Sequence, residues 1–125
     1  MGILISIAFL FFLPSALANY TDEEIADAIY LAEGGVKAKV PFGILSVKCD
    51  GYNDCRKVCL NTIRNNRKRY KKYGYKKYKT FLEFLASRYA PVGASNDPHN
   101  LNRYWLKNVK YFLQHKKTQK KKGKI

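Results

Sequence analysis

The sequence predicts a mainly helical domain of the α+β kind, with four main helices and a small hairpin or extended segment after the first. Three observations lead to this fold class. Apolar residues recur at helical spacing in four stretches, capping signals precede two of them, and a Gly or Pro follows each of the first three. The chain of 125 residues is long enough for one domain with a modest core.

The first helix is expected over about residues 22–33. Thr21 and Glu24 have the spacing of a capping box, in which each side chain satisfies a backbone N–H of the other. Gly34 can supply the left-handed residue that ends the helix. One face of this helix repeats at helical spacing and is expected to be buried: Ile25, Ala28, Ile29 and Ala32.

The segment 36–48 alternates loosely between apolar and polar residues. The turn formers Pro41-Phe42-Gly43 divide it into two short pieces, which indicates a small hairpin or an irregular loop.

Three further helices are expected, at about 54–73, from Thr80 to Pro91, and at about 102–114. Gly74 ends the second, and Thr80 with Glu83 gives the third a capping box. The apolar stripes expected to be buried are Cys55, Val58, Cys59, Thr62 and Ile63, then Phe81, Leu82, Phe84, Leu85 and Tyr89, then Trp105, Leu106, Val109, Phe112 and Leu113.

The two ends of the chain differ in composition from the middle. Residues 1–18 carry no charge, are mostly apolar and end in Ala16-Leu17-Ala18, which predicts a signal peptide cleaved after Ala18. An uncleaved anchor is the alternative, but the apolar run is shorter than the roughly 20 residues of a spanning helix. We therefore expect export to the periplasm or the extracellular space, and no stable membrane span after cleavage. Residues 115–125 are rich in lysine and are expected to form a disordered basic tail.

The charge is one-sided. The chain has 24 Lys and Arg against 9 Asp and Glu, a formal net charge of +15. Such a field indicates an anionic partner. Because export is expected, a polymer of the cell envelope fits better than nucleic acid, and the protein itself is expected to be a monomer.

The three cysteines, Cys49, Cys55 and Cys59, permit one disulfide in an exported protein. Cys49 can reach either of the other two, so the pairing stays open. The two histidines, His99 and His115, lie far along the chain from the cysteines. We therefore expect no metal site and no cofactor.

Glu33 is the acidic residue that local structure does not explain. The acids at the start of the first helix suit a helix N-terminus, whereas Glu33 lies at its end, where the helix dipole disfavours an anion. Such a carboxylate is either simply exposed to solvent or has a raised pKa that serves general acid catalysis. Asp97, in an Asn-Asp-Pro turn, is the weaker candidate, because this sequence usually builds a turn.

Two segments resemble the lysozyme-like superfamily, and its lytic transglycosylase branch most closely. Ala32-Glu33-Gly34-Gly35 resembles the catalytic glutamate at a helix end, and Phe42-Gly43-Ile44-Leu45-Ser46 resembles the Gly-aliphatic segment that follows it. The segment 85–91 resembles the tyrosine-containing turn of transglycosylases, with Tyr89 at the tyrosine position.

The resemblance implies a single lysozyme-like helical domain over residues 19–114, acting as a peptidoglycan-cleaving enzyme. It implies that Glu33 is the single catalytic acid, that Tyr89 binds substrate, and that Gly43, Ile44 and Ser46 form the wall of the cleft. The alternative is a non-enzymatic cationic protein that binds envelope polymers or nucleic acid through the basic, tyrosine-rich segment 64–79 and the tail.

Overall fold

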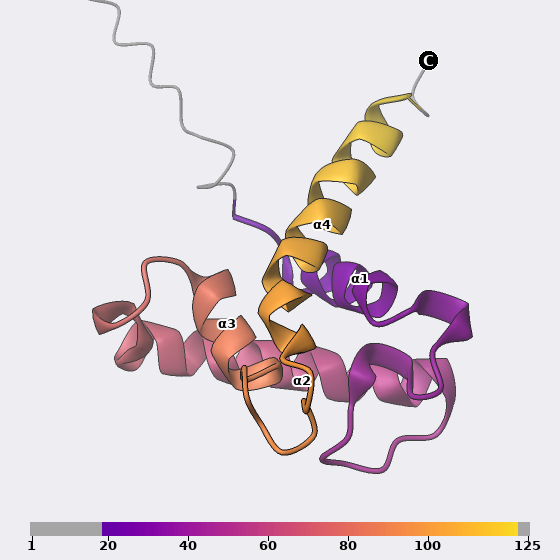
Figure 1. Cartoon of the computed structure of the whole chain (residues 1–125). Helices are drawn as coiled ribbons and strands as arrows, with labels where there is room; N and C mark the ends of the chain where they lie inside the picture. The colour runs from indigo at the N-terminus through magenta and orange to yellow at the C-terminus, as the bar shows by residue number, and fades with distance from the viewer. Residues whose placement is uncertain (1–18, 123–125) are drawn as a thin grey trace, which may run out of the picture.

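The long helix α2 (Gly51–Lys72) is the base on which two other helices pack (Figure 1). The computed structural model describes residues 19–122. α1 (Asp22–Ala32) and α3 (Phe81–Tyr89) both lie against α2, and α4 (Trp105–Lys122) packs on α1 and α3. These four α-helices confirm the mainly helical class.

Short 3-10 helices, and no strands, connect the α-helices within the described residues. The expected hairpin after the first helix, and with it the α+β character, is therefore not confirmed. The reason is conformational: Gly34, Gly35 and Gly43 have φ values of 112°, 59° and 64°, which lie in the left-handed region that strands do not use. The 3-10 helices are η2 (Gly35–Lys37), η3 (Pro41–Gly43), η4 (Gly74–Lys76) and η5 (Leu101–Tyr104).

One core joins the four α-helices, and the predicted apolar faces supply most of it. Phe42, from η3, is also completely buried in this core, so the 41–43 turn is held in place by burial of a large ring. The buried residues of the helices include Ile25, Ala28 and Ile29 of α1, Cys55, Cys59 and Ile63 of α2, Phe84 and Leu85 of α3, and Trp105, Val109 and Leu113 of α4. The other residues of the predicted faces are only half-buried: Ala32, Val58, Thr62, Phe81, Leu82, Tyr89, Leu106 and Phe112.

Ion pairs align α1 along α2. Asp27 accepts from Arg56 at 3.1 Å, and Asp22 pairs closely with Arg67 and, at 3.7 Å, with Arg64. Such partly exposed pairs contribute about 1 kcal/mol or less each. Their main effect is to fix the direction in which α1 runs, and hence where its last residue lies.

The starts of α1 and α3 agree with the capping signals, whereas the start of α2 differs. Thr80 accepts from the backbone N–H of Glu83 at 3.2 Å and caps α3. Thr21 and Glu24 form the predicted capping box, with both hydrogen bonds at 3.1 Å. α2 begins at Gly51, three residues before the predicted start at 54.

The C-terminal segment also differs from the prediction. Disorder is predicted from residue 115, whereas α4 continues to Lys122. Lysine has a good helix propensity, and extending an existing helix requires no new nucleation. The predicted signal peptide, residues 1–18, lies outside the described residues.

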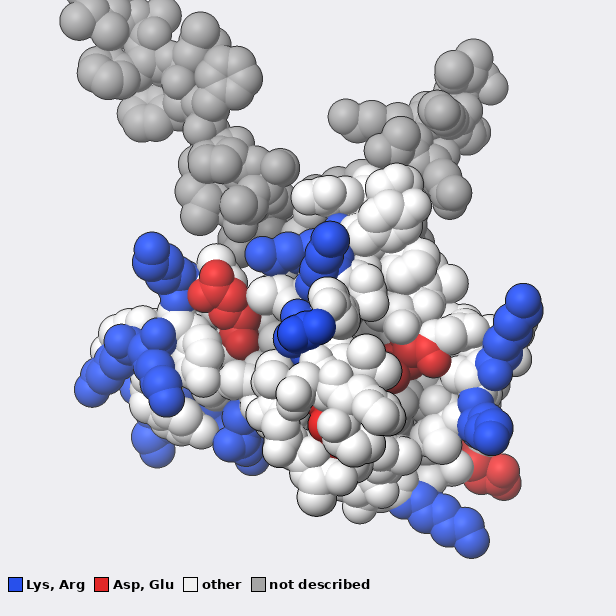
Figure 2. Space-filling model, in the orientation of Figure 1, with Lys and Arg blue, Asp and Glu red and all other residues white. Residues whose placement is uncertain are grey.

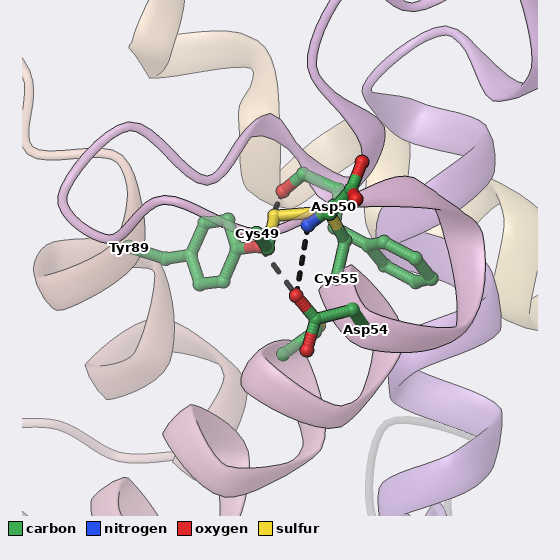
Figure 3. The surroundings of a disulfide bond; sticks show 7 residues. Cys49, Asp50, Asp54, Cys55 and Tyr89 are labelled. Carbon is green, nitrogen blue, oxygen red and sulfur yellow. Dashed lines mark hydrogen bonds between the residues drawn. A yellow bond between two sulfur atoms is a disulfide. The ribbon is translucent and has the colours of Figure 1, made fainter.

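The disulfide joins Cys49 to Cys55, and Cys59 is a free, buried thiol. The bond ties the end of the 44–50 loop to the first turns of α2 (Figure 3). Beside it the backbone N–H of Asp50 donates to the Asp54 carboxylate at 2.8 Å. The disulfide thus fixes the C-terminal end of the 44–50 loop against α2.

Candidate active site

Glu33 lies directly after α1 and turns its carboxylate inward. Its backbone N–H donates to the carbonyl of Ile29 at 2.9 Å, and Gly34 then takes the left-handed conformation that ends the helix, as predicted. The carboxylate oxygen Oε1 accepts a hydrogen bond of 2.9 Å from the indole Nε1 of Trp105. The side chain is half-buried. Of the two interpretations of Glu33, the simply exposed carboxylate does not fit this environment.

Gly43 lies in close contact with the Glu33 carboxylate. A Cβ atom built on Gly43 would lie 2.4 Å from Oε2 of Glu33 and 2.9 Å from Oε1, far inside van der Waals contact. The backbone φ of Gly43 is 64°, a value that residues with a side chain rarely adopt. Two independent features therefore favour glycine at this position.

Tyr89 lies behind this contact and supports it. Its hydroxyl donates a close hydrogen bond to the carbonyl oxygen of Phe42, the residue before Gly43. Its ring stacks on the indole of Trp105, with centroids 5.1 Å apart and planes at 26°. The thiol sulfur of Cys59 lies 3.8 Å from the same hydroxyl oxygen. Tyr89 thus contacts both the turn and the indole that surround Glu33.

Phe42 adopts an unusual backbone conformation for a non-glycine residue, with φ of 62°. Residues in this region store on the order of 1–3 kcal/mol of strain, which surrounding contacts must offset. The buried Phe42 ring and the Tyr89 hydrogen bond provide those contacts. The strained turn is what places Gly43 against Glu33.

Burial dominates the acid–base properties of the site. It raises the pKa of Glu33, and the hydrogen bond from Trp105 offsets part of that rise. Burial also raises the pKa of Cys59 to about 12 and raises the pKa of Tyr89, which the neighbouring Cys59 and Glu33 raise further. At neutral pH the thiol and the phenol are therefore uncharged, and Glu33 is the group of the three suited to exchange a proton.

The structure brings together some of the residues expected to form the site. Glu33 and Gly43 are in contact, and Tyr89 reaches them through Phe42 and Trp105. Ile44 instead belongs to the core, and Ser46 is exposed.

Sequence reasoning assigned Trp105 to the core only and missed its hydrogen bond. The signal was available, because Trp105 is the one tryptophan of the chain and a buried indole N–H usually finds an acceptor.

Asp97, the weaker candidate for a functional acid, has a structural role. Asp97 is buried and accepts from the backbone N–H of Leu101 at 2.7 Å and of Asn102 at 3.2 Å, so it caps η5. This is the turn-building role that its sequence favours. Among residues 19–115, no cluster of three His, Cys, Asp or Glu side chains could hold a metal ion.

Comparisons of the chain with protein families, with curated proteins and with solved structures give no match.

The contact between Gly43 and Glu33 predicts an unusually large cost for Gly43→Ala. Gly51 provides the matched control, because it also has a positive φ, of 74°, but no atom within 4 Å of an added Cβ. Both alanines incur a backbone cost of about 1 kcal/mol, and Gly43→Ala alone incurs the overlap, a further cost of about 1–3 kcal/mol. Urea unfolding of the two variants measures the difference. Equal destabilisation of both would show that the Glu33 carboxylate is not held in place against Gly43.

The raised pKa of Glu33 predicts a pH-dependent gain in stability for Glu33→Gln. A raised pKa means that the folded state binds the proton more tightly than the unfolded state, so Glu33 stabilises the fold at low pH. That contribution is lost as the pH rises through the folded-state pKa. The glutamine side chain does not titrate, and its carbonyl oxygen can still accept the hydrogen bond from the indole N–H of Trp105. Relative to wild type it should gain stability as the pH rises from about 4, the ordinary range of a glutamate pKa, towards neutral pH.

Denaturant unfolding across this pH range tests the prediction. Glu23→Gln is the control, because Glu23 is an exposed acid of the same helix. A pH-independent difference between wild type and Glu33→Gln would mean that the Glu33 carboxyl behaves like a solvated one.

Proposed function

We propose that this protein is an exported enzyme of the lysozyme or lytic transglycosylase type, which cleaves peptidoglycan with Glu33 as its general acid. The observation that supports this most strongly is the setting of Glu33. It is a half-buried carboxyl with a raised pKa, it ends a helix, and its hydrogen bond to Trp105 and contact with Gly43 fix its position. A carboxyl group kept protonated closer to neutral pH can protonate the leaving oxygen of a glycosidic bond.

A single-acid mechanism fits the distribution of carboxylates. Most glycosidases use two carboxylates on either side of the bond. Here Asp97, the one fully buried acid among the described residues, already accepts from two backbone N–H groups of η5. In the proposed reaction the glycosidic C–O bond breaks and the leaving oxygen takes the Glu33 proton. A hydroxyl of the substrate itself forms the new bond to the anomeric carbon, and its proton returns to the Glu33 carboxylate. The enzyme ends in its starting protonation state.

Trp105 has a defined role in this proposal. Its N–H donates to Glu33 and so favours the ionised form that exists after proton transfer, while burial favours the protonated form that exists before it. The two effects oppose each other, and both protonation states are accessible. Tyr89 acts through the Phe42 turn and the Trp105 ring as a positioning residue, in place of the substrate-binding role that the resemblance implies.

The location and substrate follow from other features. A disulfide is compatible with an oxidising, exported compartment. Within residues 19–122, none of the helices combines the length and the apolar character needed to cross a bilayer. A formal charge of +15 favours an anionic envelope polymer over a neutral glycan.

A non-enzymatic cationic binder is the second candidate. Exposed Tyr73, at the end of α2, and exposed Tyr75, in η4, lie among lysines. Lys and Arg side chains gather over this end of the molecule in Figure 2. Binding through such a surface weakens steeply with salt and does not need Glu33.

Glu33→Gln separates the two candidates. The enzyme predicts that purified wild-type protein clears a suspension of peptidoglycan and that Glu33→Gln slows clearing by about a hundredfold or more, the usual effect of losing a general acid. Glu23→Gln, at an exposed position on the same helix, should clear at the wild-type rate. Equal clearing by wild type and Glu33→Gln would remove Glu33 as the acid. Salt-sensitive binding without clearing by wild type would favour the binder.

A further inference from the structure

A pocket of about 450 Å³ lies at the opposite end of α1 from Glu33. Its walls come from Asn19 and Tyr20 ahead of α1, from α2, from the start of α3 and from α4. The eleven residues of α1 span about 16 Å. The pocket is therefore a separate site from the Glu33 cluster, and none of that cluster lines it.

Arg67 builds the rigid wall of the pocket. Its guanidinium pairs with Asp22, donates to the carbonyl oxygen of Tyr20 at 2.6 Å, and lies 4.5 Å from the centroid of the Phe81 ring. Asp22 neutralises the charge of Arg67, and the contacts with Asp22, Tyr20 and Phe81 fix its position. Arg67 therefore shapes the wall of the pocket but adds little to its net positive charge.

Three lysines from three elements supply the charge. Lys71 of α2, Lys79 of the loop before α3 and Lys110 of α4 all line the pocket and are exposed. Within the described part of the chain, no carboxylate lies within 4.0 Å of their amino groups. Glu83 is the one acid that lines the pocket. The site is thus strongly positive, with a single carboxylate acceptor on one side.

Two of the three aromatic rings that line the pocket, those of Tyr70 and Phe81, are already packed. Tyr70 donates its hydroxyl to the carbonyl of Tyr78 at 3.1 Å, and its ring contacts Phe81 and Phe84, with centroids 5.9 and 5.7 Å apart. Phe81 is covered by Arg67. Sites for single-stranded nucleic acid use aromatic faces that are free to stack on bases. The occupied faces of Tyr70 and Phe81 therefore argue against a nucleotide as the ligand.

We propose that this pocket binds a short acidic peptide, of the kind that branches from peptidoglycan strands. Its volume is within the range of sites for small ligands. Lys71, Lys79 and Lys110 would pair with carboxylates of the peptide, Glu83 would accept from its N–H groups, and the apolar side chain of Leu82 would contact its side chains. The choice of polymer rests on the proposed function, but binding needs no cleavage. The pocket would hold the polymer while a neighbouring stretch of strand lies at Glu33.

The test compares two charge-matched variants in the Glu33→Gln background, so that the polymer stays intact. One variant carries Lys71→Gln, Lys79→Gln and Lys110→Gln. The control carries Lys57→Gln, Lys72→Gln and Lys76→Gln, three exposed lysines that do not line the pocket, two of which belong to the same basic region. Binding to purified peptidoglycan is measured by co-sedimentation, with each single substitution measured alongside and folding checked by circular dichroism.

We expect the pocket variant to bind about tenfold more weakly than the parent protein, and the control to change by less than about twofold. On glycan strands stripped of their peptides, the two variants should bind equally. Equal losses on intact polymer would overturn the proposal in favour of a diffuse positive field. A difference that persists on stripped strands, or that appears only with a single-stranded oligonucleotide, would overturn the peptide as ligand. None of these results depends on whether Glu33 is catalytic.

Discussion

The hydrogen bond between Glu33 and Trp105 is the contact on which the candidate site depends. It joins residues 72 positions apart, from the end of α1 and the start of α4. From Trp105 the contacts continue through the stacked Tyr89 ring to the Phe42 carbonyl, and the next residue, Gly43, returns to the Glu33 carboxylate. The result is a closed ring of contacts that includes the Glu33 carboxyl group.

This arrangement has a cost in stability. It takes a carboxyl group partly out of water and holds Phe42 in a strained backbone conformation. Burial of Phe42 in the core and the hydrogen bond from Tyr89 offset that cost. The burial that destabilises the ionised carboxyl also gives it the raised pKa that general acid catalysis needs, so the cost and the proposed activity have the same physical origin.

The parts of the fold that depend on local sequence could be predicted, and those that depend on distant contacts could not. Thr21 caps α1 and Gly34 ends it as expected, because capping involves residues within one turn. Of the hairpin and the irregular loop expected at 36–48, the hairpin is not confirmed, because loose alternation gave no information on the positive φ of Phe42 and Gly43. Likewise, nothing in the sequence favoured Cys55 over Cys59 as the partner of Cys49. Glu33 could be singled out as unexplained, and a buried Trp105 indole needs an acceptor, but the sequence does not show that the two residues, 72 positions apart, meet.

The most direct test of the central claim is an NMR titration of the Glu33 side-chain carboxyl in wild-type protein and in Trp105→Phe. The arrangement described here predicts a pKa above the ordinary glutamate range in wild type, because burial outweighs the indole hydrogen bond. In Trp105→Phe the pKa should rise further, since the hydrogen bond that favours the ionised form is gone while the site stays covered by a ring. An ordinary glutamate pKa in wild type, or one that does not respond to the substitution, would contradict it.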